Sequence, residues 1–210
     1  SNSQVLEFNN DTFNLMIEKG NQATTYEPYI TPTTYQLSLG EYEFAKIGNY
    51  VVTPRNGKVV EINSLWYNSL KIMEELTTHF ETKADALKYR QMATKCQESF
   101  TKKFFNKRRK CLYDVLGDSK IRPNQLFALS LTYPIIQPNS EIAENIMNTV
   151  TKKLLNNYGL KTLAKGEKNY VDVYEGDGFR RDMSYHQGIT WPWLLGLYYD
   201  SLKNSILAEK

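Results

Sequence analysis

Hydrophobic side chains recur with the period of an α-helix along three long stretches of the chain. In residues 59–78 the spacing of three and four predicts one face of a long helix, formed by Ile62, Leu65, Trp66, Ser69, Leu70, Met73 and Leu76. The same spacing marks residues 82–105, through Tyr89, Met92, Ala93, Cys96, Phe100 and Phe104. Residues 141–156 repeat it through Ile142, Ile146, Val150 and Leu154. Ser140 stands just before this third stretch, where a hydroxyl is suited to capping a helix N-terminus.

Two further helices are predicted from the positions of prolines. "RPNQLFALSLTY" at 122–133 has Pro123 in its first turn, and residues 189–206 have Pro192 near their start. Alternating strands are scarce, and "KNYVDVYEGDG" at 168–178 is at most a short hairpin or an extended loop. The predicted fold class is therefore all-α, built from long antiparallel helix pairs whose loops carry the unusual residues.

Composition narrows the class of protein. Of 210 residues, 41% are hydrophobic and 23% are charged, which is typical of an ordered globular chain. The 26 basic and 23 acidic residues leave a net charge of +3, too little to predict a nucleic-acid partner. The densest basic run is "KRRK" at 107–110, interpreted as a solvated loop between two helices in preference to a phosphate-binding patch.

The cysteines and the hydropathy pattern exclude other classes of site. Cys96 and Cys111 have no close cysteine or histidine partners, so we expect no disulfide framework and no metal site. No apolar run of about 18 residues predicts a membrane span, and "SNSQVLEFNNDTF" lacks the order of a signal peptide. We therefore expect a cytoplasmic protein with reduced cysteines and no membrane partner.

Polar and aromatic side chains gather at three junctions between a loop and a helix. The first, "TPRNGKVVEIN" (53–63) with the turn after it, contains Arg55, Lys58, Glu61, Asn63, Trp66 and Tyr67. The second, "KIRPNQLF" (120–127), contains Arg122, Asn124 and Gln125. The third, "GDGFRRDMSYHQGITWPW" (176–193), contains Arg181, Asp182, Tyr185, His186, Gln187 and Trp191.

Each residue of these clusters also has a purely structural interpretation. Glu61 is favoured by the dipole of the helix that it begins, Asn124 can cap a helix, and a single histidine such as His186 is more often structural than catalytic. The three clusters together are harder to explain that way. Aromatic faces stack on the C–H faces of a sugar, and Asp, Arg, Asn and Gln exchange hydrogen bonds with its hydroxyls. The clusters therefore favour a carbohydrate site.

Three segments carry a recognisable family pattern: "VVTPRNGKVVEINSLWYNSL" (51–70), "IRPNQLFALSL" (121–131) and "RDMSYHQGITWPWLLGLY" (181–198). They resemble, in the same order, the C-terminal glucosidase domain of glycogen debranching enzymes, the amylo-α-1,6-glucosidase type. The resemblance implies an (α/α)₆ toroid that hydrolyses α-1,6-linked glucose at branch points of glycogen or a branched α-glucan, with inversion. It implies no metal or organic cofactor, because an inverting glycosidase uses two carboxyl groups, one as acid and one as base.

The resemblance also implies that the residues of the three clusters line the sugar subsite. The expected general acid falls where this chain has Phe44, with Glu41 and Glu43 nearby, and the expected general base falls beyond Lys210. The remaining carboxylates in the matching segments are Glu61 and Asp182. We assign them as the catalytic candidates, with holding sugar hydroxyls or orienting another carboxylate as their alternative roles.

The length of the chain matches about half of such a toroid. Residues 1–44 are expected to form a separate N-terminal segment, and residues 45–210 a partial toroid. Two alternatives stay open: a non-catalytic carbohydrate-binding or structural fragment, and a toroid glycosidase acting on another glycan. A partial toroid exposes an apolar seam, so we expect it to self-associate or to bind the rest of the toroid.

Overall fold

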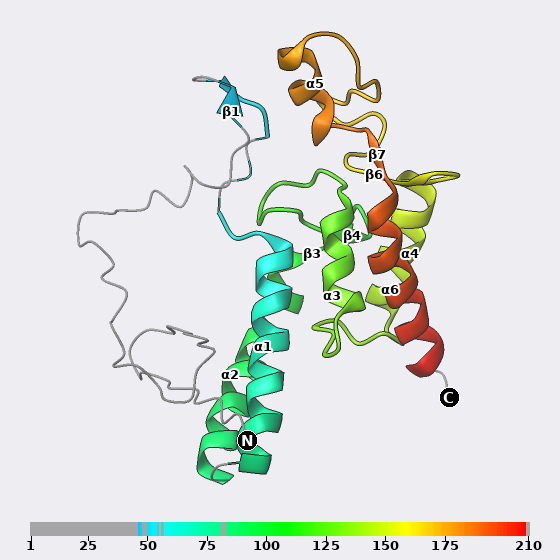
Figure 1. Cartoon of the computed structure of the whole chain (residues 1–210). Helices are drawn as coiled ribbons and strands as arrows, with labels where there is room; N and C mark the ends of the chain where they lie inside the picture. Colours follow the sequence, from blue (N-terminus) through cyan, green and yellow to red (C-terminus); the bar gives the residue numbers. More distant parts are fainter. Residues whose placement is uncertain (1–45, 48–49, 54, 56, 81–82, 209–210) are drawn as a thin grey trace, which may run out of the picture. The chain divides into compact units, whose positions relative to one another are not determined.

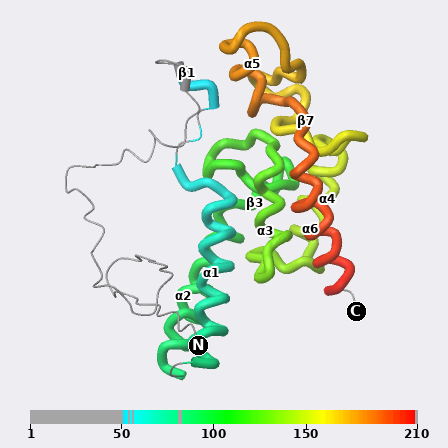
Figure 2. The backbone as a smooth tube through the Cα atoms, in the orientation of Figure 1, coloured from blue at the N-terminus to red at the C-terminus, as the bar shows by residue number. Residues whose placement is uncertain are grey.

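Helices account for most of the described chain, which confirms the all-α class (Figures 1 and 2). Helices α1 (Val60–Phe80) and α2 (Lys83–Phe104) coincide with the two long stretches predicted, and they pack along each other. Helix α4 (Glu141–Lys153) coincides with the third. The Ser140 hydroxyl accepts a hydrogen bond of 3.2 Å from the Ala143 amide, so the predicted N-cap is confirmed.

The computed structural model describes residues 46–47, 50–53, 55, 57–80 and 83–208. All of them belong to one compact unit, Leu39–Lys210. The predicted N-terminal segment 1–44, with Glu41, Glu43 and Phe44, lies outside the described residues, so the predicted boundary at residue 44 stays a prediction.

Helix α1 buries a different face from the one that its apolar residues predict. Its buried side chains are Val60, Ser64, Tyr67, Leu70, Glu74 and Thr77. Glu74 is accommodated because Arg90 of α2 donates to it at 2.7 Å and Lys71 donates from the preceding turn. Burial raises the pKa of Glu74, but these hydrogen bonds and charges outweigh it and lower the pKa overall. Because α1 buries this other face, the side chain of Ile62 is 57% exposed, and those of Leu65 and Trp66 are each 37% exposed.

The two proline-marked helices each begin as a short 3₁₀ turn. Residues 122–133 form η1 (Pro123–Leu126), which continues into α3 (Phe127–Ser130). Residues 189–206 form β7 (Thr190–Trp191), η2 (Pro192–Leu194) and α6 (Leu195–Ala208). Proline suits these first turns because its missing N–H is not needed there. Helices α3 and α6 pack against each other.

Short antiparallel strands close the loops between the helices. Strands β1 (Lys46–Ile47) and β2 (Tyr50–Val51) form one pair, and β3 (Phe105–Asn106) and β4 (Cys111–Leu112) form another. Strand β6 (Gly159–Lys161) pairs with both β5 (Leu155–Asn156) and β7, with Leu160 opposite Trp191. Strands of two or three residues are too short to show an alternating pattern, so the sequence did not predict them.

The stretch 168–178 contains no strand and runs as a loop as far as residue 177, which is the second of the two predicted alternatives. The Val171 amide ties this loop to the Gln187 carbonyl at 2.7 Å. An additional helix, α5 (Gly178–Tyr185), follows, and the side chain of Asp177 caps it by accepting from the Arg180 amide. Eight residues are too few to display a helical period, and for this reason α5 was not predicted.

The core lies beneath the loops that carry the polar clusters. Its fully buried large apolar side chains are Leu70, Leu112, Leu126, Leu129, Ile135, Ile136, Ile146, Leu154, Leu160 and Leu163. Within the described ranges, no helix combines the length and apolarity needed to cross a membrane. Because α1, η1 and η2 all start on this core, it fixes the loops that precede them.

Candidate functional site

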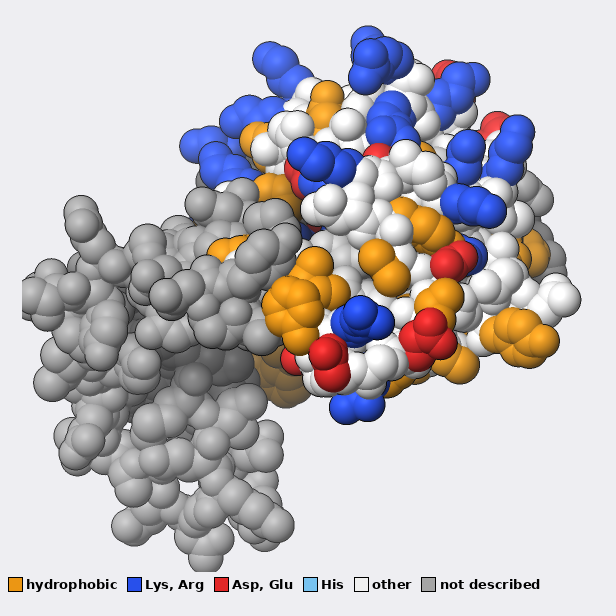
Figure 3. Space-filling view, turned by 90° about the horizontal axis from the view of Figure 1, so that it is seen from above, with side chains coloured by type: hydrophobic (Ala, Val, Ile, Leu, Met, Phe, Trp, Pro, Cys, Tyr) orange, Lys and Arg blue, Asp and Glu red, His pale blue; other side chains and the backbone are white. Residues whose placement is uncertain are grey.

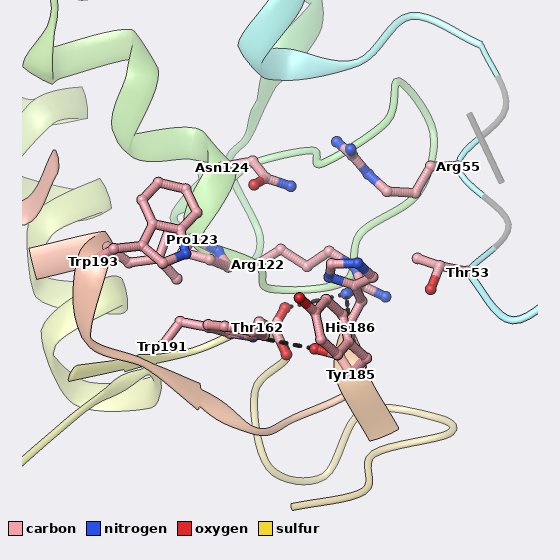
Figure 4. Close-up of a pocket in the computed structure, with 11 residues that line it drawn as sticks. Thr53, Arg55, Arg122, Pro123, Asn124, Thr162, Tyr185, His186, Trp191 and Trp193 are labelled. Atoms are coloured by element: carbon pink, nitrogen blue, oxygen red, sulfur yellow. Dashed lines mark hydrogen bonds between the residues drawn. The ribbon is translucent and has the colours of Figure 1, made fainter. Parts of the chain in front are cut away.

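A cavity of about 390 Å³ lies where the loop before α1, the start of η1, the end of α5 and the β7–η2 segment meet (Figure 4). We call it the aromatic pocket. It is lined by Thr53, Arg55, Arg122, Pro123, Asn124, Thr162, Tyr185, His186, Trp191, Trp193 and Leu194. All three predicted clusters contribute to it.

One side of the pocket is formed by a network of charged side chains around Asp114, which is 2% exposed. Arg55 donates to Asp114 Oδ2 at 2.7 Å and forms a bidentate pair with Glu61 at 2.6 and 2.7 Å. Asn124 donates to Asp114 Oδ1 at 2.9 Å, and Arg122 Nε lies 3.6 Å from Asp114 Oδ2. We call these five residues the charged network. Its two cations and two anions balance, so its net charge is zero.

The charged network and its burial shift the titration of the cations in the pocket. Burial acts to lower the pKa of Arg55, but hydrogen bonds to Glu61 and the charge of Asp114 outweigh it and raise the pKa. Burial lowers the pKa of Arg122, and Asp114 offsets only part of that. His186 is solvent-exposed on one side, yet its partial desolvation, followed by the charges of Arg122 and Arg55, lowers its pKa. The imidazole is therefore held toward its neutral form.

Arg122 also joins the loops that surround the pocket. One terminal nitrogen donates to the carbonyls of Thr162 at 3.1 Å and His186 at 2.5 Å, and the other donates to Gln187 Oε1 at 2.9 Å. Gln187 in turn donates to the Val52 carbonyl at 2.7 Å. A single buried guanidinium thus ties η1, β6, the end of α5 and the loop before α1 to one another.

The opposite side of the pocket is aromatic. The rings of Tyr185 and Trp191 meet edge to face at 4.8 Å, and those of Tyr185 and His186 at 4.7 Å. The indole nitrogen of Trp191 donates to the Tyr185 carbonyl at 3.2 Å, drawn as a dashed line in Figure 4. These contacts fix the rings without covering them, since Tyr185 is 37% exposed and Trp193 is 63% exposed.

Two glycines allow the backbone around the rings to pack this closely. Gly188 has φ +146°, and a Cβ there would lie 2.5 Å from the Val171 carbonyl oxygen. Gly159 has φ +147°, and a Cβ there would lie 2.6 Å from the Trp191 carbonyl oxygen. Only glycine, which has no Cβ, permits such close backbone approach at these two positions.

The structure places the predicted site residues in different surroundings. Those that line the aromatic pocket are Arg55, Arg122, Asn124, Tyr185, His186 and Trp191. Gln125 and Gln187 are buried beneath it, and their amide groups bond within the chain. Glu61 has both carboxylate oxygens engaged by Arg55. Arg181 and Asp182 are exposed on α5 and do not line the pocket.

Four of the predicted residues lie elsewhere. Lys58, Asn63 and Trp66 line a separate groove of about 460 Å³ between the start of α1 and the second half of α2. Tyr67, on the other side of α1, is 7% exposed and belongs to the hydrophobic core. Their contact with a sugar stays a prediction, and it requires a ligand that extends beyond the aromatic pocket or a second site.

Sequence reasoning missed Asp114, Thr53, Thr162 and Trp193. Asp114 stands in "CLYDVLGD", which is typical of an ordinary turn, and its place in the charged network depends on contacts distant in sequence. Thr53 Oγ1 is buried without a hydrogen-bond partner among the described residues, and so is Arg122 Nε. Both residues line the pocket with other atoms, and Arg122 Nε is directed at Asp114 Oδ2, 3.6 Å away.

The chemistry of the pocket follows from these groups. It offers aromatic faces and several hydrogen-bonding groups, but none of its lining residues is a carboxylate. Asp114 beneath it is neutralised by arginine and accepts hydrogen bonds on both oxygens. In the part of the chain that the structure describes, no group of three His, Cys, Asp or Glu side chains is arranged to hold a metal ion. The described geometry is therefore suited to a neutral polar molecule better than to a charged one.

Comparison with known proteins identifies the family of the chain. The family model described as amylo-alpha-1,6-glucosidase matches residues 5–208. The glycogen debranching enzyme of Saccharomyces cerevisiae is 26% identical over 79% of this chain. The match spans only 13% of that enzyme's length. The chain therefore belongs to the amylo-alpha-1,6-glucosidase family.

Proposed function

We propose that this chain forms the glucose-holding part of a glycogen-debranching amylo-α-1,6-glucosidase, which hydrolyses α-1,6-linked glucose with inversion. The observation that carries the proposal is the aromatic pocket, where exposed rings face a charge-balanced network of hydrogen-bonding groups. The family membership and the similarity to a glycogen debranching enzyme support the choice of a glucan as substrate.

Each side of the pocket matches one property of a pyranose ring. Trp191 and Tyr185 present flat faces for its C–H groups, as proteins that bind sugars require. Asn124 lines the other side, where its amide group is suited to bonding the hydroxyl groups of the sugar. His186, held toward its neutral form, both donates and accepts, which suits a hydroxyl better than an anion. The volume of about 390 Å³ lies within the range of small-molecule sites.

Hydrolysis with inversion needs two carboxyl groups roughly 6.5–9.5 Å apart, one of them protonated. Glu61 is paired with Arg55 and Asp114 with both arginines, so these two carboxylates position the network instead of transferring protons. We propose that the acid and the base come from outside the described residues. The catalytic assignment of Asp182 stays a prediction, and its exposed position on α5 would require α5 to move over a bound substrate.

The second candidate is a non-catalytic carbohydrate-binding module of the same fold. The absence of a carboxylate from the described pocket lining favours it. A third candidate, a toroid glycosidase acting on another glycan, is separated from the first by a panel of α- and β-linked oligosaccharides.

Binding is tested first, by titrating the chain with glucose and with an iminosugar in a calorimeter. We expect Trp191→Ala and Asn124→Ala each to weaken binding about tenfold, because each removes one side of the pocket. Tyr199→Ala is the matched control, since Tyr199 is an exposed ring on α6 outside the pocket. Equal affinity in all three variants would show that the sugar binds elsewhere.

Catalysis is tested separately, by incubating the chain with branched limit dextrin and measuring free glucose. Release above that of a heat-inactivated sample supports the glucosidase and excludes the binding module. One outcome is that the chain binds the sugar without releasing glucose, while a longer protein that contains it does release glucose. This result supports the proposal that the carboxylates lie outside the described residues. Binding without release in both proteins would establish the non-catalytic module.

A further inference from the structure

The basic run "KRRK" lies in the connection between helices α2 and α3, as its sequence predicted. It forms the turn between β3 and β4 and packs against the last turns of α4. Together they enclose a hollow of about 470 Å³, which we call the basic pocket. It is lined by Arg108, Arg109, Lys110, Ile121, Asn145, Asn148, Thr149, Lys152 and Lys153.

The turn is held in place by hydrogen bonds on both sides. The Arg109 amide donates to Asn106 Oδ1 at 3.2 Å. The Thr149 hydroxyl donates to the carbonyl of Lys110 at 2.9 Å, and Lys110 has a left-handed φ of +53°. A residue other than glycine adopts this conformation only at some cost, so the surrounding contacts must stabilise it. The cations of the turn are therefore presented by an ordered backbone.

The charges in the basic pocket are not balanced. Of its five cationic side chains, only Arg109 has an acidic partner within the described part of the chain, Glu167 at 2.5 Å. The other four, Arg108, Lys110, Lys152 and Lys153, pair with no acidic side chain in the described ranges. The helix dipole favours Lys152 and Lys153 at the end of α4, but it does not explain Arg108 and Lys110 opposite them. These four exposed cations line the same hollow, and a bound anion would offset the repulsion between their like charges.

The uneven distribution of charge is visible on the surface. In Figure 3, lysine and arginine side chains gather along one edge with few acidic side chains among them, although the net charge of the whole chain is only +3. Asn145, Asn148 and Lys152 also share one face of α4, because they are spaced by three and four residues. The amides add directional donors to the charges, which a diffuse basic surface would lack.

We propose that the basic pocket binds a phosphorylated small molecule. Four unbalanced cations and two amides match the charge and the many acceptor oxygens of phosphoryl groups. A nucleic acid fits less well, because the lining has no aromatic side chain to stack on a base and the cations surround a hollow. The site is separate from the aromatic pocket, shares no lining residue with it, and does not depend on the proposed function.

The test uses pyrophosphate as the probe, titrated into the whole chain in a calorimeter. We expect binding that weakens at least about tenfold in the double variant Arg108→Glu/Lys152→Glu, because two attractive charges become repulsive. Lys203→Glu on α6 is the matched control, an exposed lysine outside both pockets, and it should leave the affinity within about twofold. Unchanged affinity in the double variant would overturn the proposal.

A second variant separates a defined site from general attraction to a basic surface. Asn148→Ala leaves every charge in place, and we expect it to weaken pyrophosphate binding about threefold by removing one donor. Loss of binding only in the charge variants would overturn the proposal in favour of diffuse attraction. The proposal would also be overturned if an RNA oligomer bound more tightly than pyrophosphate and the Arg108→Glu/Lys152→Glu change abolished that binding. Circular dichroism of each variant confirms that the fold is retained.

Discussion

The aromatic pocket and the basic pocket both contain arginines, but acidic side chains balance the positive charge only in the aromatic pocket. In the aromatic pocket, Arg55 and Arg122 are matched by Glu61 and Asp114. In the basic pocket, four of five cations have no acidic partner among the described residues. The first pocket therefore presents oriented donors without net charge, and the second presents net charge on a fixed turn.

This difference indicates the kind of ligand that each pocket accepts. A neutral polyol gains from oriented donors and aromatic faces, while the net charge around it contributes little. An anion gains from the net charge itself, and it loses that gain as salt screens it. An arginine in a pocket thus says little about the ligand until its counter-charges are known.

The largest expected effect comes from removing the buried anion of the aromatic pocket. Asp114→Ala leaves two arginines without a shared counter-charge, so we expect a loss of about 3–5 kcal/mol in the free energy of unfolding. Urea denaturation measures it. Asp118→Ala is the control, because Asp118 pairs with Lys120 in a partly exposed position and should cost less than about 1 kcal/mol. Similar losses in both variants would contradict the central position of Asp114.

The second prediction gives the aromatic pocket a net positive charge, as the basic pocket has. Glu61→Gln keeps the shape of the side chain but leaves the charged network with a net charge of +1, and we expect a stability loss of about 1–3 kcal/mol. In the Arg108→Glu/Lys152→Glu background, the same change should create weak pyrophosphate binding that the parent lacks. Glu175→Gln, at an exposed loop position, serves as the control. No new anion binding would show that charge balance does not set ligand choice.

The third prediction needs no mutation. Raising sodium chloride from about 50 mM to about 300 mM should weaken pyrophosphate binding roughly fivefold, since the charges at the basic pocket are exposed to screening. Glucose or iminosugar binding should stay within about twofold over the same range, because the aromatic pocket has no net charge. Parallel titrations of one protein sample measure both. A sugar affinity that falls as steeply as the pyrophosphate affinity would remove the distinction between the pockets.

The comparison also shows how much could be predicted from the sequence. Local rules were sufficient for the helix start at Ser140 and for the turns at Pro123 and Pro192, because neighbours in sequence determine each of them. The three clusters at loop–helix junctions identified the polar and aromatic sides of the pocket. They could not show that Trp66, on α1, lines the separate groove beside α2 instead of the aromatic pocket.

What the sequence could not show depends on contacts between distant residues. Asp114 meets Arg55 across 59 positions, and nothing near it in the sequence indicates that it is buried. The buried face of α1 was predicted wrongly for a related reason. Glu74 reads as a surface residue until its pairing with Arg90 of α2 is known, and Ile62 reads as a core residue although it is exposed. The unbalanced charge of the basic pocket likewise needed α4 to be placed beside the turn.

The smallest expected effect concerns one proton on His186, and it tests the charge argument by pH alone. Its pKa in the folded chain is lowered from the ordinary value near 6.5, by partial desolvation and by the charges of Arg122 and Arg55. The neutral form is the one that folding favours, so this contribution to stability is complete above the unfolded pKa and is lost as pH falls through the folded pKa.

Protonation of His186 adds a positive charge to the aromatic pocket, as Glu61→Gln does by mutation. We therefore expect sugar affinity to fall modestly below pH 6, and weak pyrophosphate binding to appear in the Arg108→Glu/Lys152→Glu background over the same interval. An NMR titration of the imidazole, assigned with His186→Gln, gives the pKa, and the same variant should lack both changes in binding. If the His186→Gln variant showed the same pH dependence, another group would carry it, and the neutral imidazole would have no part in excluding anions from the pocket.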